Sequence, residues 1–586
     1  MSAGDVARPD RVSEPIQRVG HKPAPASLAR VRLVFWALGL VLAAAQIWVF
    51  RYQVSTDSIS YLDMSDGVLR GSDWHRLING IWSPLYPFLL GIARRVFSIP
   101  AQNEIVAAHW MNLGFFLFAF LCFEFLLRGM FRRTEQRAET RVRAGAPSPV
   151  PGWSYLVIAY SLFLWASIDG ISVRNLRPDM LMSGFVYLAV EILLRMQGRL
   201  ARWKDYLALG LVLGVGVLAK EPLLPLGMLM ILASLFAVEN WRPALKMSGG
   251  ALLLLVSIGS LYFIPLSLAR GFFTLGQSGK FNYIVHVNRA GPTLYLQTPG
   301  SARGSFAHPP EKIFSSPPAY AFPAPGQVTY PLRFDPSNWT EGVQPHFVLG
   351  SQAKVILHNA LNMGVLLVDL SAVIAAVLAL AYFSPGRVPR GLLRTWPIWL
   401  VGLAGCAMYA PVHVESRYVA EFIALFWLGI IATLQIPHNL SRKVVTLGTM
   451  AIAASLLFPL VLRTYTSYLQ TGRGPNVDFE AAAALRGVGI RPGDHVARIS
   501  PTFFSYDIAM ERIARVQVSA EVDFEHAEEF WSSSPATQNQ LLQTFASHGA
   551  KAVIATSPQL TPINQADWTR LGSTQYWVWL PSSLHS

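Results

Sequence analysis

The sequence predicts an α-helical polytopic membrane protein with a large outward loop and a small C-terminal α/β domain. Hydrophobic residues make up 52% of the 586 residues and charged residues only 14%, whereas soluble proteins carry about 25% charged residues. Long apolar runs recur until about residue 466, where shorter helix and strand patterns begin. We therefore expect a tail over 1–30, a transmembrane part over 31–465 and an extramembrane α/β domain over 466–586.

The apolar runs divide into about eleven transmembrane helices, each near the ~20 residues that cross a bilayer. The run 205–238 is too long for one span, and Lys220-Glu221-Pro222 at its middle predicts a hairpin. Asp169 and Pro178-Asp179 similarly divide the run 153–195. The predicted spans are 31–50, 104–127, 153–168, 178–195, 205–220, 222–238, 247–268, 355–383, 395–412, 418–436 and 443–463.

The basic residues between the spans predict the orientation of the chain. They gather in the tail before residue 31 and in the segments 128–143, 195–204, 242–246, 387–394 and 442–443. All of these lie on one side of an eleven-span protein, and the positive-inside rule makes that side cytoplasmic. Because topology accounts for the net charge of +14, the charge does not indicate nucleic-acid binding. The C-terminal domain is then expected outside.

The first outward loop, 51–103, begins with a cluster of acids. Asp57, Asp63, Asp66 and Asp73 follow the first span closely, and acids beside the acyl region are costly unless they pair, face water or bind a ligand. This predicts a functional site. The alternative is a short solvated helix capped by Ser55-Thr56-Asp57.

Four cations on the predicted outer surface oppose the charge bias. Arg174, Arg177, Lys220 and Arg417 lie in or beside the short loops 169–177, 220–222 and 413–417. Such cations favour an anionic head group as ligand. The alternatives are contacts with lipid head groups or local ion pairs, for which the nearby acids are Asp169, Asp179, Glu221 and Glu415.

The outward loop 269–354 is rich in Pro, Gly and aromatic residues, which rules out a helical domain and predicts an ordered, irregular lid. A flexible connector is the alternative. In the last domain, 478–500 and 541–556 each read as helix, turn and strand, and 568–580 reads as a β-hairpin. The segment GVGIRPG follows a helix and precedes a strand, the reverse of the order in nucleotide-binding loops.

Five motifs in order carry a resemblance to a known family. They are STDSISYLDMSDGVLRG and WSPLYPFLLG after the first span, RNLRPDMLM opening the fourth, LAKEPLL opening the sixth and HVESRY opening the tenth. Over residues 31–465 the chain resembles the GT-C superfamily of polyprenyl-phosphate-sugar-dependent glycosyltransferases. The similar branch includes protein mannosyltransferases, the lipid A aminoarabinose transferase and rhizobial lipopolysaccharide sugar transferases.

The resemblance implies transfer of a hexosyl or pentosyl group, with inversion, from a polyprenyl-phosphate donor to a lipid, glycan or protein acceptor. It places the chain in a bacterial cytoplasmic membrane with the last domain in the periplasm. Asp57 matches the first-loop acid that serves as general base or positions the acceptor hydroxyl, and Asp179 matches the acid that orients the acceptor or a metal. For the donor phosphate the implied residues are Lys220 and Arg417, with Arg177 and Arg174 as competitors. For the acceptor or lid they are Asp63, Asp66, Tyr61 and Tyr418.

Some functional alternatives stay open at this point. The protein mannosyltransferases have Asp-Glu in the first loop, whereas Asp57 is followed by Ser58, so their acceptor class does not transfer. A divalent metal ion is a candidate cofactor, with Asp57, Asp179, His413 and Glu415 as candidate ligands, although His413 and Glu415 also fit an interfacial polar cluster. The competing classes are a transporter or flippase of lipid-linked sugars, a non-catalytic envelope scaffold, and an oligosaccharide polymerase or ligase that uses a lipid-diphosphate donor.

Overall fold

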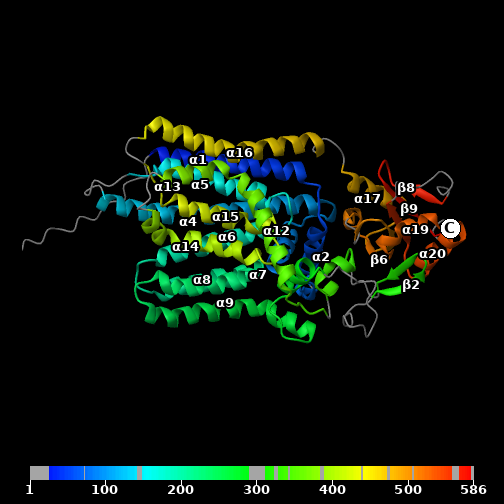
Figure 1. The fold of residues 1–586 in the computed structure, drawn as a ribbon. Helices are drawn as coiled ribbons and strands as arrows, with labels where there is room; N and C mark the ends of the chain where they lie inside the picture. Colours follow the sequence, from blue (N-terminus) through cyan, green and yellow to red (C-terminus); the bar gives the residue numbers. More distant parts are fainter. Residues whose placement is uncertain are drawn as a thin grey trace, which may run out of the picture.

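Apolar helices lie at every predicted span in the computed structural model, which describes residues 26–71, 73–141, 148–289, 310–322, 328–340, 343–382, 388–436, 440–471, 476–503, 507–556 and 567–581. Figure 1 shows them packed side by side as a bundle. They are α1 (Ala26–Phe50), α4 (Glu104–Arg141), α5 (Gly152–Leu164), α6 (Asp179–Met196), α7 (Trp203–Ala219), α8 (Leu223–Ala237), α9 (Trp241–Arg270), α12 (Leu349–Val368), α13 (Ser371–Tyr382), α14 (Val388–Tyr409), α15 (Ser416–Ile431) and α16 (Arg442–Thr471). A π-helical turn, η4 (Trp165–Ile171), extends α5.

Two spans differ most from the prediction, and six of the described helices are each long and apolar enough to cross a membrane, or up to seven if α12 and α13 make one span. The run 355–383 forms α12 and α13, which are bent by 85° at a short break and so do not make one straight helix. Helix α16 continues to Thr471 instead of ending near residue 463. Its 30 residues correspond to about 45 Å, longer than a hydrocarbon core of about 30 Å. Its end therefore reaches toward the C-terminal domain (Figure 1).

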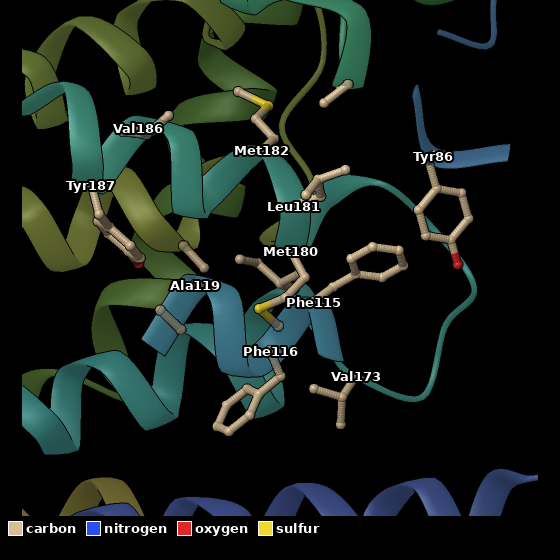
Figure 2. Close-up of a cluster of buried hydrophobic side chains, with 14 of the residues drawn as sticks. Tyr86, Phe115, Phe116, Ala119, Val173, Met180, Leu181, Met182, Val186 and Tyr187 are labelled. Carbon is tan, nitrogen blue, oxygen red and sulfur yellow. The ribbon is translucent and has the colours of Figure 1, made fainter. Parts of the chain in front are cut away.

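The bundle core fixes the start of α6. Helices α4 and α6 pack closely, and Figure 2 shows this interface, with Phe115, Phe116 and Ala119 from α4 and Met180, Val186 and Tyr187 from α6. On the far side, Gly402 of α14 faces the backbone of α15, where an added Cβ would lie 2.5 Å from the Phe422 carbonyl oxygen. Small residues at such contacts let membrane helices approach closely. Packing thus fixes α6 against α4 and the middle of α15 against α14.

The loop 51–103, which the sequence predicts to face outward, folds into short helices at one end of the bundle. They are α2 (Thr56–Arg70), η1 (Trp74–Leu77), α3 (Leu85–Val96) and η2 (Ala101–Asn103). The cap of the alternative interpretation forms, because the Ser55 side chain accepts a hydrogen bond from the Ser58 amide at 3.3 Å, but α2 is largely buried and is not a solvated helix. Asp57 is therefore not the cap but lies in the first turn of α2. Figure 1 shows α2 at the same end of the bundle as the C-terminal domain.

The C-terminal domain confirms the predicted helix–turn–strand repeats and the closing hairpin. Its strands β5 (His495–Ile499), β6 (Gln517–Val522), β7 (Ala552–Thr556), β8 (Trp568–Arg570) and β9 (Tyr576–Trp579) belong to one mixed sheet, ordered β2-β3-β6-β5-β7-β9-β8. The central β6, β5 and β7 run parallel, and β9 and β8 run antiparallel. The helices of the domain are α17 (Val477–Gly487), α18 (Ala509–Ala514), η9 (Phe524–His526), α19 (Ala527–Ser532) and α20 (Pro535–Ser547).

The long outward loop is more regular than predicted. Its strands β2 (Glu311–Ser315) and β3 (Pro318–Ala321) form a hairpin that joins the C-terminal sheet, where β3 pairs antiparallel with β6. Short turns of helix follow and precede it: α10 (Ser278–Asn282), η5 (Tyr283–Val287), α11 (Pro331–Phe334) and η7 (Pro336–Thr340). The hairpin covers an edge of β6 that would otherwise be open for pairing. A separate two-stranded pair joins β1 (Ser148–Pro149) to β4 (Gln435–Ile436).

Reporter fusions test the orientation that the basic residues predict. Fusions after Arg143 and Arg390 are expected to read cytoplasmic, and fusions near Pro310 and Ser519 to read external. The readout is the activity of a reporter that folds on one side only. A cytoplasmic reading at Ser519 would contradict the orientation, because it would require the C-terminal domain on the other side of the membrane.

Candidate functional site

A cavity of about 270 Å³ opens at the end of the bundle that carries α2. Residues that the sequence analysis singled out from four separate segments line it: Tyr61, Asp179, Lys220, His413, Arg417 and Tyr418. The rest of its wall is largely apolar, with Leu224, Leu275 and Met408 among the lining side chains. The cavity therefore combines cations with a hydrophobic wall.

The charges in this cavity are arranged around Tyr418. The Lys220 ammonium lies 2.5 Å from Asp179 Oδ1 and 4.3 Å from the centre of the Tyr418 ring. The Arg417 guanidinium lies 4.6 Å from the same ring and donates to the Tyr418 hydroxyl at 2.8 Å. A desolvated cation over an aromatic face is stabilised by the ring quadrupole. Lys220 and Arg417, which are distant in sequence, are thereby held at one site.

Asp57 lies beside this cavity among three arginines. Its carboxylate is 3.2 Å from Arg177 Nη2, 3.4 Å from Arg333 Nη2 and 3.6 Å from Arg417 Nη1. Arg417 Nε also pairs with Glu415 at 2.5 Å, the local ion pair that the sequence left open, so two carboxylates face the three guanidiniums. Because Arg417 touches Asp57 and also lines the cavity, a phosphate in the cavity would share this arginine with Asp57.

Arg333 is a site residue that sequence reasoning missed. It lies in the segment 328–340 of the long loop, which packs onto α2, and it donates to Thr56 Oγ1 at 2.7 Å. Its carbonyl accepts from Ser60 Oγ at 2.9 Å. Asp335 anchors the same segment by accepting from the Gly80 amide at 2.8 Å and pairing with Arg270 of α9. A single arginine in a Pro- and aromatic-rich loop carries no spacing signal, so only its contacts identify it.

The local ion pair between Lys220 and Glu221, which are neighbours in the sequence, does not form. Lys220 pairs with Asp179 and not with Glu221, whose carboxylate accepts from the Ser278 amide at 3.1 Å. Burial raises the pKa of Glu221 despite that hydrogen bond. Gly276 lies against Glu221 with φ of 125°, and an added Cβ there would come 2.3 Å from the carboxyl group, so this wall of the cavity requires a glycine.

The remaining outer charges pair elsewhere. Asp169 pairs with Arg463 of α16, so it does not neutralise Arg174 or Arg177. Arg174 does not line the cavity, and its guanidinium lies 5.2 Å from the centre of the Phe50 ring. Of the two competitors for the phosphate, the structure thus brings Arg177 to Asp57 and leaves Arg174 outside the cavity.

Asp63 and Asp66 do not line the cavity either, because they are buried in an ion cluster between α2 and the C-terminal domain. This interdomain ion cluster joins three carboxylates to three guanidiniums: Asp63, Asp66 and Glu104 with Arg94, Arg512 and Arg515. Arg512 of α18 reaches Asp63 at 2.5 Å, Asp66 at 2.9 Å and Glu104 at 2.7 Å. The helix that carries Asp57 is therefore tied directly to the C-terminal domain.

The pKa values of the two aspartates in this cluster are shifted in opposite directions. Burial raises the pKa of Asp63, more than Arg512 lowers it. Burial also opposes the charge on Asp66, but Arg512, Arg515 and Arg94 together hold the pKa of that carboxyl well below its usual range. Hydrogen bonds to Asp63 from the Thr329 amide and hydroxyl, at 3.0 and 2.9 Å, add the long loop to the same cluster.

The candidate metal ligands do not form a metal site in the described part of the chain. Asp57 is engaged by arginines and Asp179 by Lys220, while His413 and Glu415 contact each other at 3.1 Å. Burial would raise the pKa of Glu415, but His413 and Arg417 outweigh it and lower this pKa to about 2. The described residues hold no group of three or more His, Cys, Asp or Glu side chains placed for a metal ion. These side chains therefore fit ion pairing and not metal ligation.

Comparisons with known proteins give structural similarity only. The chain matches no protein-family model and no curated protein. Its structure is similar to ArnT from Cupriavidus metallidurans bound to undecaprenyl phosphate, with 13% identity and a TM-score of 0.44 over 94% of this chain and 98% of that chain. The apo form of that ArnT gives 13% identity and a TM-score of 0.41 over 94% and 99%.

An oligosaccharyltransferase from Archaeoglobus fulgidus, in complex with zinc and sulfate, is also similar. It has 14% identity and a TM-score of 0.44 over 88% of this chain and 68% of that chain.

Proposed function

We propose that the protein is a membrane glycosyltransferase that moves a sugar from a polyprenyl-phosphate donor to an acceptor hydroxyl. The observation that carries the proposal is the cavity at the end of the bundle, where Lys220 and Arg417 lie beside an apolar wall and Asp57 lies next to Arg417. A phosphate joined to a hydrocarbon chain matches both parts of this lining. Charge-assisted contacts to a phosphate are strong where water is partly excluded.

Asp57 takes the role of general base in this proposal. The acceptor oxygen forms a bond to the anomeric carbon, the bond from that carbon to the phosphate oxygen breaks, and the hydroxyl proton passes to Asp57. The polyprenyl phosphate leaves with its negative charge, which Lys220 and Arg417 stabilise. Arg177 and Arg333 hold the Asp57 carboxylate in position. Attack on the face opposite the leaving phosphate inverts the anomeric configuration.

A donor panel tests the activity directly. Purified full-length protein is incubated with a set of short-chain polyprenyl-phosphate sugars, and the products are identified by mass spectrometry. Release of polyprenyl phosphate with transfer or hydrolysis of one sugar is the expected result. Undecaprenyl phosphate, which the similar ArnT binds, is added in a parallel reaction, where it should compete with the donor for the cavity. Binding of the donors without any release would favour a flippase, and no binding would contradict the proposal.

Arg417→Ala is expected to weaken donor binding by about 1.5–3 kcal/mol, the range for hydrogen bonds to charged groups. Arg417→Lys should recover only part of this loss, because an ammonium cannot form the bidentate fork of a guanidinium. Lys220→Ala should also weaken binding. The measurement is the dissociation constant of a short-chain polyprenyl-phosphate sugar in detergent.

Arg463→Ala is the matched control for this series. Arg463 lies on α16 and pairs with Asp169 away from the cavity, so its removal should leave donor affinity nearly unchanged. Equal affinity for wild type, Arg417→Ala and Lys220→Ala would remove both cations from the phosphate site.

A further inference from the structure

A second cavity, of about 500 Å³, lies where the end of α1 and the end of α16 meet the first turn of α2 and the start of α17. It shares no lining residue with the first cavity. Its size lies within the range of small-molecule sites. Because its walls come from the bundle on one side and the C-terminal domain on the other, this site exists only when the two are docked.

The second cavity reaches the immediate neighbourhood of Asp57. Ser55 and Ser58, two residues before and one residue after Asp57, line it. Arg174 and Asn175 line it as well, in the loop whose Arg177 contacts Asp57. The wall of this cavity therefore includes residues one and two positions along the chain from Asp57, which itself lines neither cavity.

Its lining is rich in unused neutral hydrogen-bonding groups. Gln53, Asn175 and Gln470 line it, and no described residue forms a hydrogen bond with their carboxamide groups; Gln53 and Gln470 are exposed and Asn175 is half-buried. Asp478 Oδ1 accepts a hydrogen bond from the Tyr576 hydroxyl at 2.8 Å. Its Oδ2 forms no hydrogen bond with any described residue. A carboxamide offers two donors and an acceptor, and a carboxylate offers acceptors only. Together they match a ligand that both donates and accepts at many points.

Other ligand classes fit this lining poorly. A phosphate would require several cations, and Arg174 is the one cation among the described residues that line the cavity. A hydrocarbon tail would require apolar walls, and valines 49, 54 and 477 are the aliphatic side chains there. A peptide added as a strand would require an open sheet edge, whereas these walls are helix ends and loops. A compact molecule bearing many hydroxyl groups remains.

We propose that this second cavity binds the carbohydrate part of the acceptor and presents one of its hydroxyl groups to Asp57. The inference rests on the proposed function, because it assigns the acceptor of the same transfer. The donor phosphate then lies on the side of Arg417 and the acceptor sugar on the side of Ser55 and Ser58. The C-terminal domain contributes Asn476 and Asp478, so it forms part of the acceptor site.

The test measures carbohydrate binding separately from donor binding. Full-length protein in lipid nanodiscs is applied to an array of bacterial oligosaccharides, and the dissociation constant of the best-bound glycan is measured. The cavity variant is Gln53→Ala/Asn175→Ala/Gln470→Ala. The control variant is Asn539→Ala/Gln540→Ala, which removes two exposed amides from α20, outside the cavity. Donor binding of all three proteins is measured with a short-chain polyprenyl-phosphate sugar.

We expect glycan affinity to fall at least tenfold in the cavity variant, with glycan affinity of the control variant and donor affinity of all three proteins unchanged. Equal glycan affinity in wild type and cavity variant would overturn the inference, as would a wild type that binds donor and no glycan. Glycan binding lost in the cavity variant, in a protein that binds no donor, would support the carbohydrate site and refute the proposed donor.

A second arm distinguishes the source of the carbohydrate. Intact lipopolysaccharide and the oligosaccharide released from it by mild acid are compared as ligands of the wild type. Tighter binding of the intact molecule indicates an acceptor that is anchored in the membrane, and equal binding indicates a free glycan. Both results support the carbohydrate site. If the cavity variant bound the intact lipopolysaccharide and the released oligosaccharide as tightly as wild type, the inference would be contradicted.

Discussion

The Asp57→Asn variant is expected to turn over donor at least ~100-fold more slowly than wild type, the scale for loss of a positioned general base. Asparagine keeps the shape of the side chain but cannot take the proton from the acceptor hydroxyl. Because Lys220 and Arg417 are unchanged, the variant should remain inserted in the membrane and bind the donor. The measurement is single-turnover release of polyprenyl phosphate beside the dissociation constant of the donor.

Asp73→Asn is the control for the loss of a carboxylate in the same loop. Asp73 accepts from Arg76 at 2.6 Å, away from the cavity, so this variant should turn over donor nearly as fast as wild type. If Asp57→Asn were as active as Asp73→Asn, Asp57 would be a structural acid among arginines, and Asp179 would become the candidate base.

The Arg512→Ala variant is expected to lose about 3–5 kcal/mol of the free energy that holds the C-terminal domain on the bundle. The physical reason is that Asp63, Asp66 and Glu104 would remain buried without their shared partner, and removing one member of a buried ion pair is costly. The measurement is the midpoint of heat-induced change in tryptophan fluorescence in detergent, together with protease sensitivity of the C-terminal domain.

Lys551→Ala is the matched control because it removes an exposed ion pair from the same domain. Lys551 contacts Asp494 at 2.6 Å, and its side chain is 54% exposed, so its loss should cost no more than about 1 kcal/mol. The stability loss of Arg512→Lys should lie between those of Arg512→Ala and Lys551→Ala, because an ammonium keeps the positive charge but cannot form the bidentate contacts of a guanidinium. Equal midpoints for Arg512→Ala and Lys551→Ala would show that the interdomain ion cluster does not hold the domain.

The ion cluster also has a consequence for catalysis. It holds the middle of α2, whose first turn carries Asp57, and Thr329 ties the long loop to the same Asp63. Since Arg333 of that loop contacts Asp57, two routes connect the C-terminal domain to the proposed base. Arg512→Ala is therefore also expected to turn over donor more slowly than wild type while its donor affinity stays unchanged.

The sequence by itself determined the features that local patterns encode. Apolar runs of about 20 residues located the membrane helices, because each span satisfies its own backbone hydrogen bonds. Lys220-Glu221-Pro222 located the hairpin between α7 and α8, and Ser55 the start of α2. The hairpin of β8 and β9 was also predicted, from the alternation of apolar and polar residues and the turn between the two strands.

Only the tertiary structure decided which charges meet. Lys220 has Glu221 next to it in the chain and pairs instead with Asp179, 41 residues away, while Asp63 finds Arg512 at a separation of 449 residues. The hairpin of β2 and β3 likewise joins a sheet built almost 200 residues later in the chain. A charge has many possible partners in a sequence, and the docking of helices and domains selects among them, because burial makes an unpaired charge costly. For that reason the sequence predicted the acids and cations of the site, whereas the fold separated those that line the first cavity from those that hold the C-terminal domain.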